Sequence, residues 1–124
     1  MNTDEKDILS LAISGLYESK DIDSLKTWSE GIKKDAREMS EHLGRKVKVL
    51  VDLRGAIGYT DPRVLIVFAE LMKANDPYVL KTATFGGTKE HEMAEEMIKM
   101  FAFRNNLKNF KTEEDARAWL NKTE

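Results

Sequence analysis

The residues best suited to hold an anion are the consecutive Gly86, Gly87 and Thr88, which follow a β-branched, apolar segment. Free backbone N–H groups at the start of a helix can bind phosphate. However, the chain lacks both the Walker phosphate-loop spacing and the dinucleotide pattern G-x-G-x-x-G. A phosphate or nucleotide site at residues 86–88 therefore remains an alternative, and a simple turn in which Thr88 caps the next helix is the plainer interpretation.

Charged side chains suggest two further kinds of chemistry. Asp52 near Arg54 could form a catalytic pair, but no histidine, cysteine or second acid adjoins them in sequence. His91 and Glu92 resemble half of a zinc-protease motif, but Glu95 stands where the second histidine is needed. We therefore expect no catalytic residue, no metal site and no cofactor, and hence a protein that is not an enzyme.

Composition narrows the class of protein further. The chain has 124 residues, 20 basic and 22 acidic side chains, and no cysteine. This length predicts a single domain over residues 1–124. The lack of cysteine excludes disulfides and thiolate chemistry. A net charge of -2 argues against a nucleic-acid-binding protein, which usually carries a basic excess.

The chain also carries no sequence signal for a membrane. Its first residues are acidic and lack the apolar segment of a secretory signal. The longest uninterrupted apolar run, residues 64–69, is far shorter than the roughly 20 residues that span a bilayer. We therefore expect a cytoplasmic protein without a membrane span.

The elements that would position these residues alternate between strands and helices. Strands are expected at 8–14, 47–53, 79–85 and 107–110, with a loop at 54–60. Helices are expected at about 21–43, 61–75 and 88–103, with a last one after Thr112. The order β-α-β-α-β-α-β-α with short connections predicts an α/β fold: a four-stranded, mostly parallel sheet with helices on both faces.

Apolar side chains on two of these helices suggest a binding surface. Phe68 and Met72 on one helix, and Met93, Met97 and Phe101 on the next, could line a pocket between helices and sheet. Methionine suits adaptable apolar binding, although at helical spacing an ordinary core is the simpler interpretation. The helix that follows Pro62 is apolar on more than one face, which makes a homodimer reasonable.

Four segments carry a resemblance to a known family. They are the strand and turn at 49–55, Thr60-Asp61-Pro62 opening an apolar helix, Ile13-Ser14-Gly15-Leu16 at the end of the first strand, and the closing segment 110–120. Together they resemble the STAS superfamily, in particular its SpoIIAA-like branch, over about residues 8–121. That branch is also grouped with lipid-transfer domains of the CRAL-TRIO type.

The resemblance implies a non-enzymatic domain that binds a partner. In the family's antagonists, a serine at the start of a helix is phosphorylated and so switches partner binding. Here the corresponding pair is Thr60-Asp61, so an aspartate stands in the serine's place. The resemblance therefore implies a module without the usual phosphoserine switch, with Thr60 as a less favoured phosphate acceptor.

Two functional hypotheses follow, beside the phosphate alternative. In the first, the chain is a protein-interaction or regulatory module whose partner, or second copy, contacts the loop and the helix after it through Arg54, Gly55, Tyr59, Thr60 and Asp61. In the second, the chain carries or senses a small apolar, lipid-like ligand.

Overall fold

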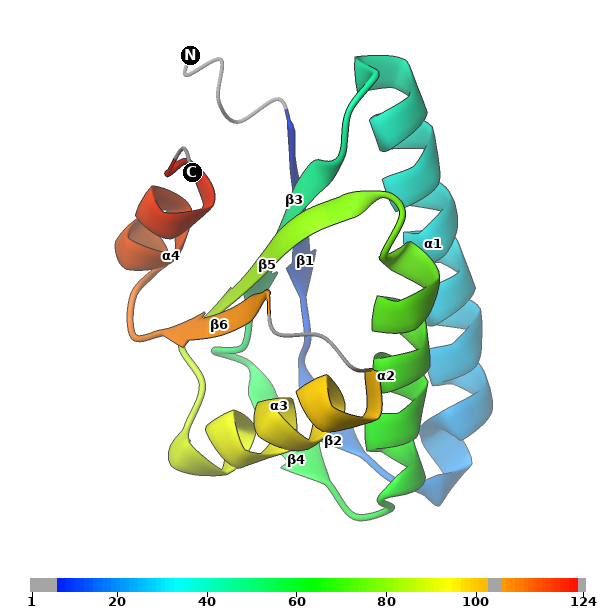
Figure 1. Ribbon diagram of the computed structural model, residues 1–124. Helices are drawn as coiled ribbons and strands as arrows, with labels where there is room; N and C mark the ends of the chain where they lie inside the picture. The colour runs from blue at the N-terminus through cyan, green and yellow to red at the C-terminus, as the bar shows by residue number, and fades with distance from the viewer. Residues whose placement is uncertain (1–6, 103–105, 123–124) are drawn as a thin grey trace.

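The computed structural model describes residues 7–102 and 106–122, except for the side chain of Phe101 (Figure 1). Strands and helices alternate along the chain as expected. The strands are β1 (Ile8–Ala12), β2 (Gly15–Tyr17), β3 (Val47–Asp52), β4 (Ala56–Tyr59), β5 (Val79–Phe85) and β6 (Leu107–Phe110). The α-helices are α1 (Ile22–Leu43), α2 (Arg63–Asn75), α3 (Lys89–Ala102) and α4 (Glu113–Leu120).

The main sheet contains four parallel strands in the order β1-β3-β5-β6. This arrangement confirms the predicted α/β fold. β3 is rich in valine and buried along most of its length, as a central strand with both faces covered must be. The register pairs Val49 with Leu9 on one side and with Thr82 on the other.

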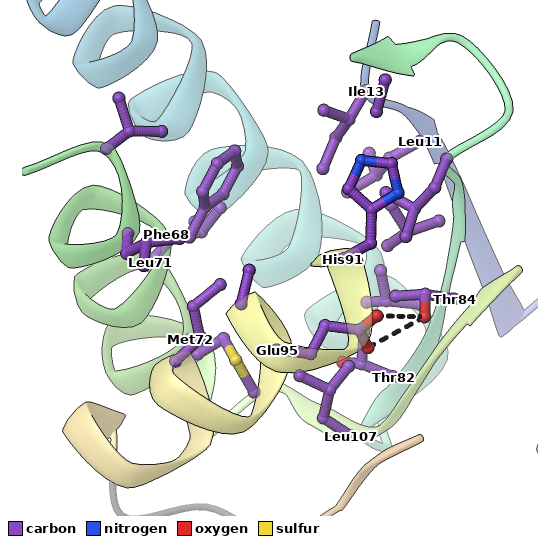
Figure 2. Close-up of a pocket in the computed structure, with 18 of the residues that line it drawn as sticks. Leu11, Ile13, Phe68, Leu71, Met72, Thr82, Thr84, His91, Glu95 and Leu107 are labelled. Carbon is purple, nitrogen blue, oxygen red and sulfur yellow. Dashed lines mark hydrogen bonds between the residues drawn. The ribbon is translucent and has the colours of Figure 1, made fainter. Parts of the chain in front are cut away.

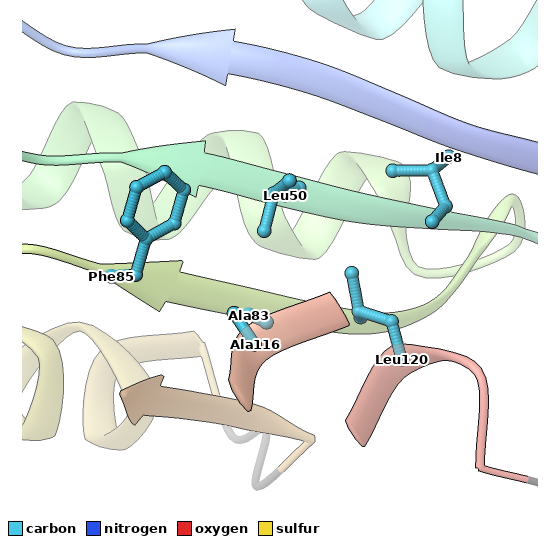
Figure 3. Close-up of a cluster of buried hydrophobic side chains, with 6 residues drawn as sticks. All are labelled: Ile8, Leu50, Ala83, Phe85, Ala116 and Leu120. Carbon is cyan, nitrogen blue, oxygen red and sulfur yellow. The ribbon is translucent and has the colours of Figure 1, made fainter. Parts of the chain in front are cut away.

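Helices cover both faces of this sheet, as predicted (Figure 1). α4 lies on one face, where Ala116 and Leu120 pack against Leu50 and Ala83 (Figure 3). α1, α2 and α3 lie on the opposite face. There α1 packs on the valines of β3 through Ala36, whereas α2 packs chiefly on α1 and α3.

A second, two-stranded sheet was not predicted. β4 lies inside the segment 54–60 that was expected to be a loop, and β2 continues the expected first strand after a break at residues 13–14. β2 and β4 pair in parallel. The turn into β2 needs Gly15, which has φ of +85°. Pairing between such short, distant segments leaves no local periodicity in the sequence, which is why the pattern missed it.

Two helix ends have the expected capping interactions, whereas the side chain of Asp21 makes no capping hydrogen bond at the start of α1. Gly44 ends α1 in the left-handed conformation, with φ of +70°. Thr112 caps α4 by accepting a hydrogen bond from the backbone N–H of Asp115 at 3.2 Å. Among the described helices, none combines the length and the apolar character needed to cross a bilayer.

Candidate functional site: a cavity between the sheet and three helices

A cavity of about 150 Å³ lies between the main sheet and helices α1, α2 and α3 (Figure 2). We call it the sheet cavity. Most of its walls are aliphatic or aromatic side chains contributed by every layer of this half of the domain. They include Leu11, Ile13, Trp28, Ile32, Val49, Val51, Leu53, Val64, Leu65, Phe68, Leu71, Met72, Val79, Ile98 and Leu107. The cavity is therefore an apolar chamber with a contribution from each surrounding element.

The position of α2 explains why space remains. This helix packs on α1 and α3 and faces the sheet across the cavity through Phe68, Leu71 and Met72 (Figure 2). Edge-to-face contacts with the rings of Tyr17 and Trp28 hold the ring of Phe68, with centroids 6.3 Å and 6.1 Å apart. Bulky side chains thus keep α2 at a distance that the side chains of the sheet do not fill.

The main polar feature of the wall is a buried carboxyl group, that of Glu95 on α3. The Thr84 hydroxyl lies 2.9 Å and 3.0 Å from its two oxygens, and Nδ2 of Asn109 donates to Oε2 at 2.9 Å. Burial raises the pKa of Glu95, and the hydrogen bonds from Thr84 and Asn109 oppose that shift. The cluster ties α3 to β5 and β6 at the cavity wall.

A second polar group of the wall is the imidazole of His91, whose ring points from α3 towards Leu11 and Ile13 in Figure 2. Its Nδ1 accepts a hydrogen bond from the backbone N–H of Thr88 at 2.8 Å. Its Nε2 is buried and has no hydrogen-bond partner in the described part of the chain. The same holds for Oδ1 of Asn75, another lining residue.

The glycines at the start of α3 serve packing. A Cβ atom at Gly86 would collide with the side chain of Arg54, and one at Gly87 would lie 3.0 Å from His91 and from Leu53. The Thr88 amide that a phosphate would need already donates to His91. The geometry at residues 86–88 thus matches a capped turn and offers nothing specific to a phosphate group.

The start of α2 holds a compact polar cluster around Asp61. Its carboxylate accepts hydrogen bonds from the Ser19 hydroxyl at 2.8 Å and from the backbone N–H of Arg63 at 2.9 Å, and it pairs with the Arg63 guanidinium. These contacts hold the pKa of the Asp61 carboxyl well below its usual range, the Arg63 side chain contributing most. Asp61 therefore carries a charge that its own neighbour compensates.

The neighbouring turn is also tied internally. Asp52 accepts hydrogen bonds from both the backbone and the guanidinium of Arg54, the closest at 2.8 Å. This bonding lowers the pKa of Asp52, and the Arg54 guanidinium stacks over the ring of Phe85 at 5.2 Å. Gly55 packs closely on Ser14. The Asp52–Arg54 pair is thus held as a structural turn beside the second sheet.

The residues predicted to line a pocket fall into two groups. Phe68 and Met72 line the sheet cavity. The prediction that Met93 and Met97 line it too is wrong, because these side chains are 68% and 42% exposed on the outer face of α3. The residues of α3 that do line the cavity, His91, Ala94, Glu95 and Ile98, lie on the side of the helix that faces the cavity. The side chain of Phe101 lies outside the described residues.

The remaining predicted residues lie at the rim or on the surface. Tyr59 contributes to the cavity wall while staying partly exposed, and Thr60 is exposed beside it. Most of the apolar surface of α2 is buried inside the domain, and Ile66 is its large exposed exception among the described residues. The predicted homodimer would therefore have less exposed apolar surface on α2 for its interface than the sequence suggested.

Sequence reasoning missed Glu95, His91 and Asn75 as parts of the wall. Three glutamates lie within the five residues 92–96, a pattern typical of a solvated helix face, so this pattern offered no reason to expect Glu95 to be buried. The signal that could have found Glu95 is its spacing: it lies three residues before Ile98, on the buried side of α3. Within the described residues, no group of three acidic or histidine side chains is arranged to hold a metal ion.

The family model described as SpoIIAA-like matches residues 8–121, nearly the whole chain. No curated protein matches the chain significantly. STAS domains are generally non-enzymatic modules that resemble anti-sigma-factor antagonists.

Proposed function

We propose that this chain, which belongs to the SpoIIAA-like family of STAS domains, carries or senses a small apolar ligand in the sheet cavity. Membership of this family suggests a regulatory or interaction module. The observation that supports this proposal is the cavity itself. A space of roughly 150 Å³ is large enough for a benzene-sized molecule, and most of the side chains that line this one are aliphatic or aromatic. We further propose that the domain has no enzymatic activity of its own.

The cavity also has an energetic rationale as a binding site. Empty apolar space lowers stability, because the lining atoms lose dispersion contacts. A ligand that fills the space restores those contacts and stabilises the native state by mass action. A small apolar molecule would therefore be retained by the folded domain and lost on unfolding.

Native mass spectrometry of gently purified protein tests the proposal. The wild-type chain should carry a small molecule of defined mass. The variant Ala94→Phe places a ring in the cavity wall and should give the bare protein mass. Ala118→Phe makes the same change at an exposed position of α4 and should retain the ligand. A bare mass for the wild type, together with no thermal stabilisation by benzene-sized apolar compounds, would contradict the proposal.

The exposed segment 54–60 supports a second candidate function, the binding of a protein partner. Ile57 is 72% exposed there, and Tyr59 is partly exposed beside Thr60. In this proposal the module works without the usual phosphoserine switch, because the place of the serine is taken by Asp61, which is paired with Arg63. Partners captured by the wild-type chain should be lost from the variant Tyr59→Ala and weakened by Asp61→Asn. Unchanged capture by both variants would count against this surface.

A further inference from the structure

The wall of the sheet cavity offers no counter-charge to an anionic ligand. No lysine or arginine occurs among its described lining residues, and Glu95 is the sole carboxylic acid among them. Both oxygens of Glu95 are already engaged by Thr84, and Oε2 also by Asn109. A carboxylate or phosphate that entered would lose its hydration and gain no cation. The wall therefore disfavours fatty-acid carboxylates and phosphorylated ligands.

The imidazole of His91 presents its Nε2 to the cavity as a hydrogen-bonding group. Its Nδ1 accepts the backbone N–H of Thr88, so this nitrogen carries no proton. In a neutral ring the proton then resides on Nε2, which becomes a donor. Nε2 is shielded from water and unpartnered among the described residues. A buried donor without a partner is costly, and an acceptor atom on a ligand would remove that cost.

We propose that the sheet cavity selects an uncharged, largely apolar ligand that carries one accepting oxygen, such as a ketone, ester or alcohol, with that oxygen directed at Nε2 of His91. Glu95 on the same helix, one turn away, excludes the corresponding carboxylates. This inference rests on the proposed ligand-binding function and adds the chemical class of the ligand.

Three probes of equal non-hydrogen atom count test the selectivity: acetophenone, cumene and benzoate. They share a benzene ring, which suits the size of the cavity, and differ in the attached group. Binding is measured on the full chain at neutral pH, from chemical-shift changes of amide signals along β3, α2 and α3. We expect acetophenone to bind best, cumene about threefold to tenfold more weakly, since it lacks the accepting oxygen, and benzoate weakest of the three.

Variants assign the selectivity to the two side chains. His91→Phe should remove the preference for acetophenone over cumene. His42→Phe, the matched change at the other histidine, which is exposed on α1, should preserve the preference. The isosteric Glu95→Gln should raise the affinity for benzoate relative to that for cumene.

The outcomes separate the inference from the proposed function. If none of the probes binds the wild type, the ligand-binding function itself fails and the inference with it. If cumene binds and acetophenone binds no better, the donor role of His91 is overturned while the function stands. If benzoate binds as well as acetophenone, or gains nothing from Glu95→Gln, the exclusion of anions is overturned.

Discussion

The two faces of the main sheet share the same four strands, but side chains fill the space on one face and leave a cavity on the other. On the face covered by α4, Leu50 and Ala83 meet Ala116 and Leu120, and both helix residues are fully buried (Figure 3). On the opposite face, three helices enclose the sheet cavity (Figure 2). A single short helix can lie directly on a sheet, whereas α2 rests on two other helices and leaves space beneath it.

The contrast assigns different roles to the two faces. Close packing on the α4 face surrounds buried side chains such as Ala116 and Leu120 with partners, which stabilises the fold. The cavity on the other face forgoes such contacts around Phe68 and Leu71. Empty apolar space is costly in an otherwise packed domain, and this cost supports the ligand-binding function that we propose for that face.

The largest expected contrast comes from truncating a leucine on each face. Leu120→Ala should lower the free energy of unfolding by about 4 kcal/mol, because it opens a new hole in a filled interior. Leu71→Ala should cost about 2 kcal/mol, because this side chain already borders empty space. Urea unfolding midpoints at constant slope measure both values. Equal losses would show that the two faces are packed alike.

Enlarging an alanine on each face reverses the test. Ala116→Phe should destabilise the protein by about 3 kcal/mol, because a ring cannot fit where Ala116 is fully buried between α4 and the sheet. Ala94→Phe should change stability by less than about 1 kcal/mol, since the cavity can take the ring. Thermal unfolding of the two purified variants provides the comparison, and a heavily destabilised Ala94→Phe would argue that the cavity is closed to new groups.

The buried carboxyl of Glu95 predicts a pH dependence that originates on the cavity face. Burial raises its pKa in the folded state, so the native protein holds this proton more tightly than the unfolded chain. The stability it contributes is therefore present below the unfolded pKa and lost as the pH rises through the raised folded value. Glu95→Gln should remove this part of the pH dependence of unfolding. Glu114→Gln, an exposed change on α4, should leave it in place.

The smallest expected contrast is between the threonine caps of α4 and α3, which are Thr112 and Thr88. Thr112 accepts the Asp115 amide at 3.2 Å, so Thr112→Ala should cost about 1 kcal/mol. Thr88 accepts the His91 amide at a longer 3.4 Å, while the His91 ring binds the Thr88 amide in return. Thr88→Ala should therefore cost about half as much. The difference is measurable by urea unfolding, and a larger loss at Thr88 would show that α3 depends on its cap more than α4 does.

Much of the fold could be predicted because the signals for its elements are local. The apolar stripe that runs from Ile22 to Ala36 predicted α1, and the valines of β3 predicted a central strand. Thr112 marked the start of α4. By contrast, β4 is short and partly exposed, and it forms only because β2 lies beside it. A strand that depends on a distant partner carries too little periodicity to be recognised from its own residues.

The site was predicted only in part, because the orientation of α3 decides it. On α2, Phe68 and Met72 line the sheet cavity, between helices and sheet where a pocket was expected. On α3 the methionines Met93 and Met97 were assigned inward, yet they are exposed. Hydropathy favours burying methionine over glutamate. The tertiary structure overrides that preference because Thr84 and Asn109 supply the hydrogen bonds that a buried Glu95 requires.

The sequence by itself determined the alternation of strands and helices, the parallel sheet, the capped helix ends and the family, because each depends on neighbouring residues or on a pattern along the chain. Only the tertiary structure decided that α2 stands away from the sheet and that Glu95 and His91 form part of a cavity wall. These features depend on how bulky side chains from separate elements meet in space. Local periodicity reports which side of a helix is apolar, and it does not report how closely that side approaches its neighbour.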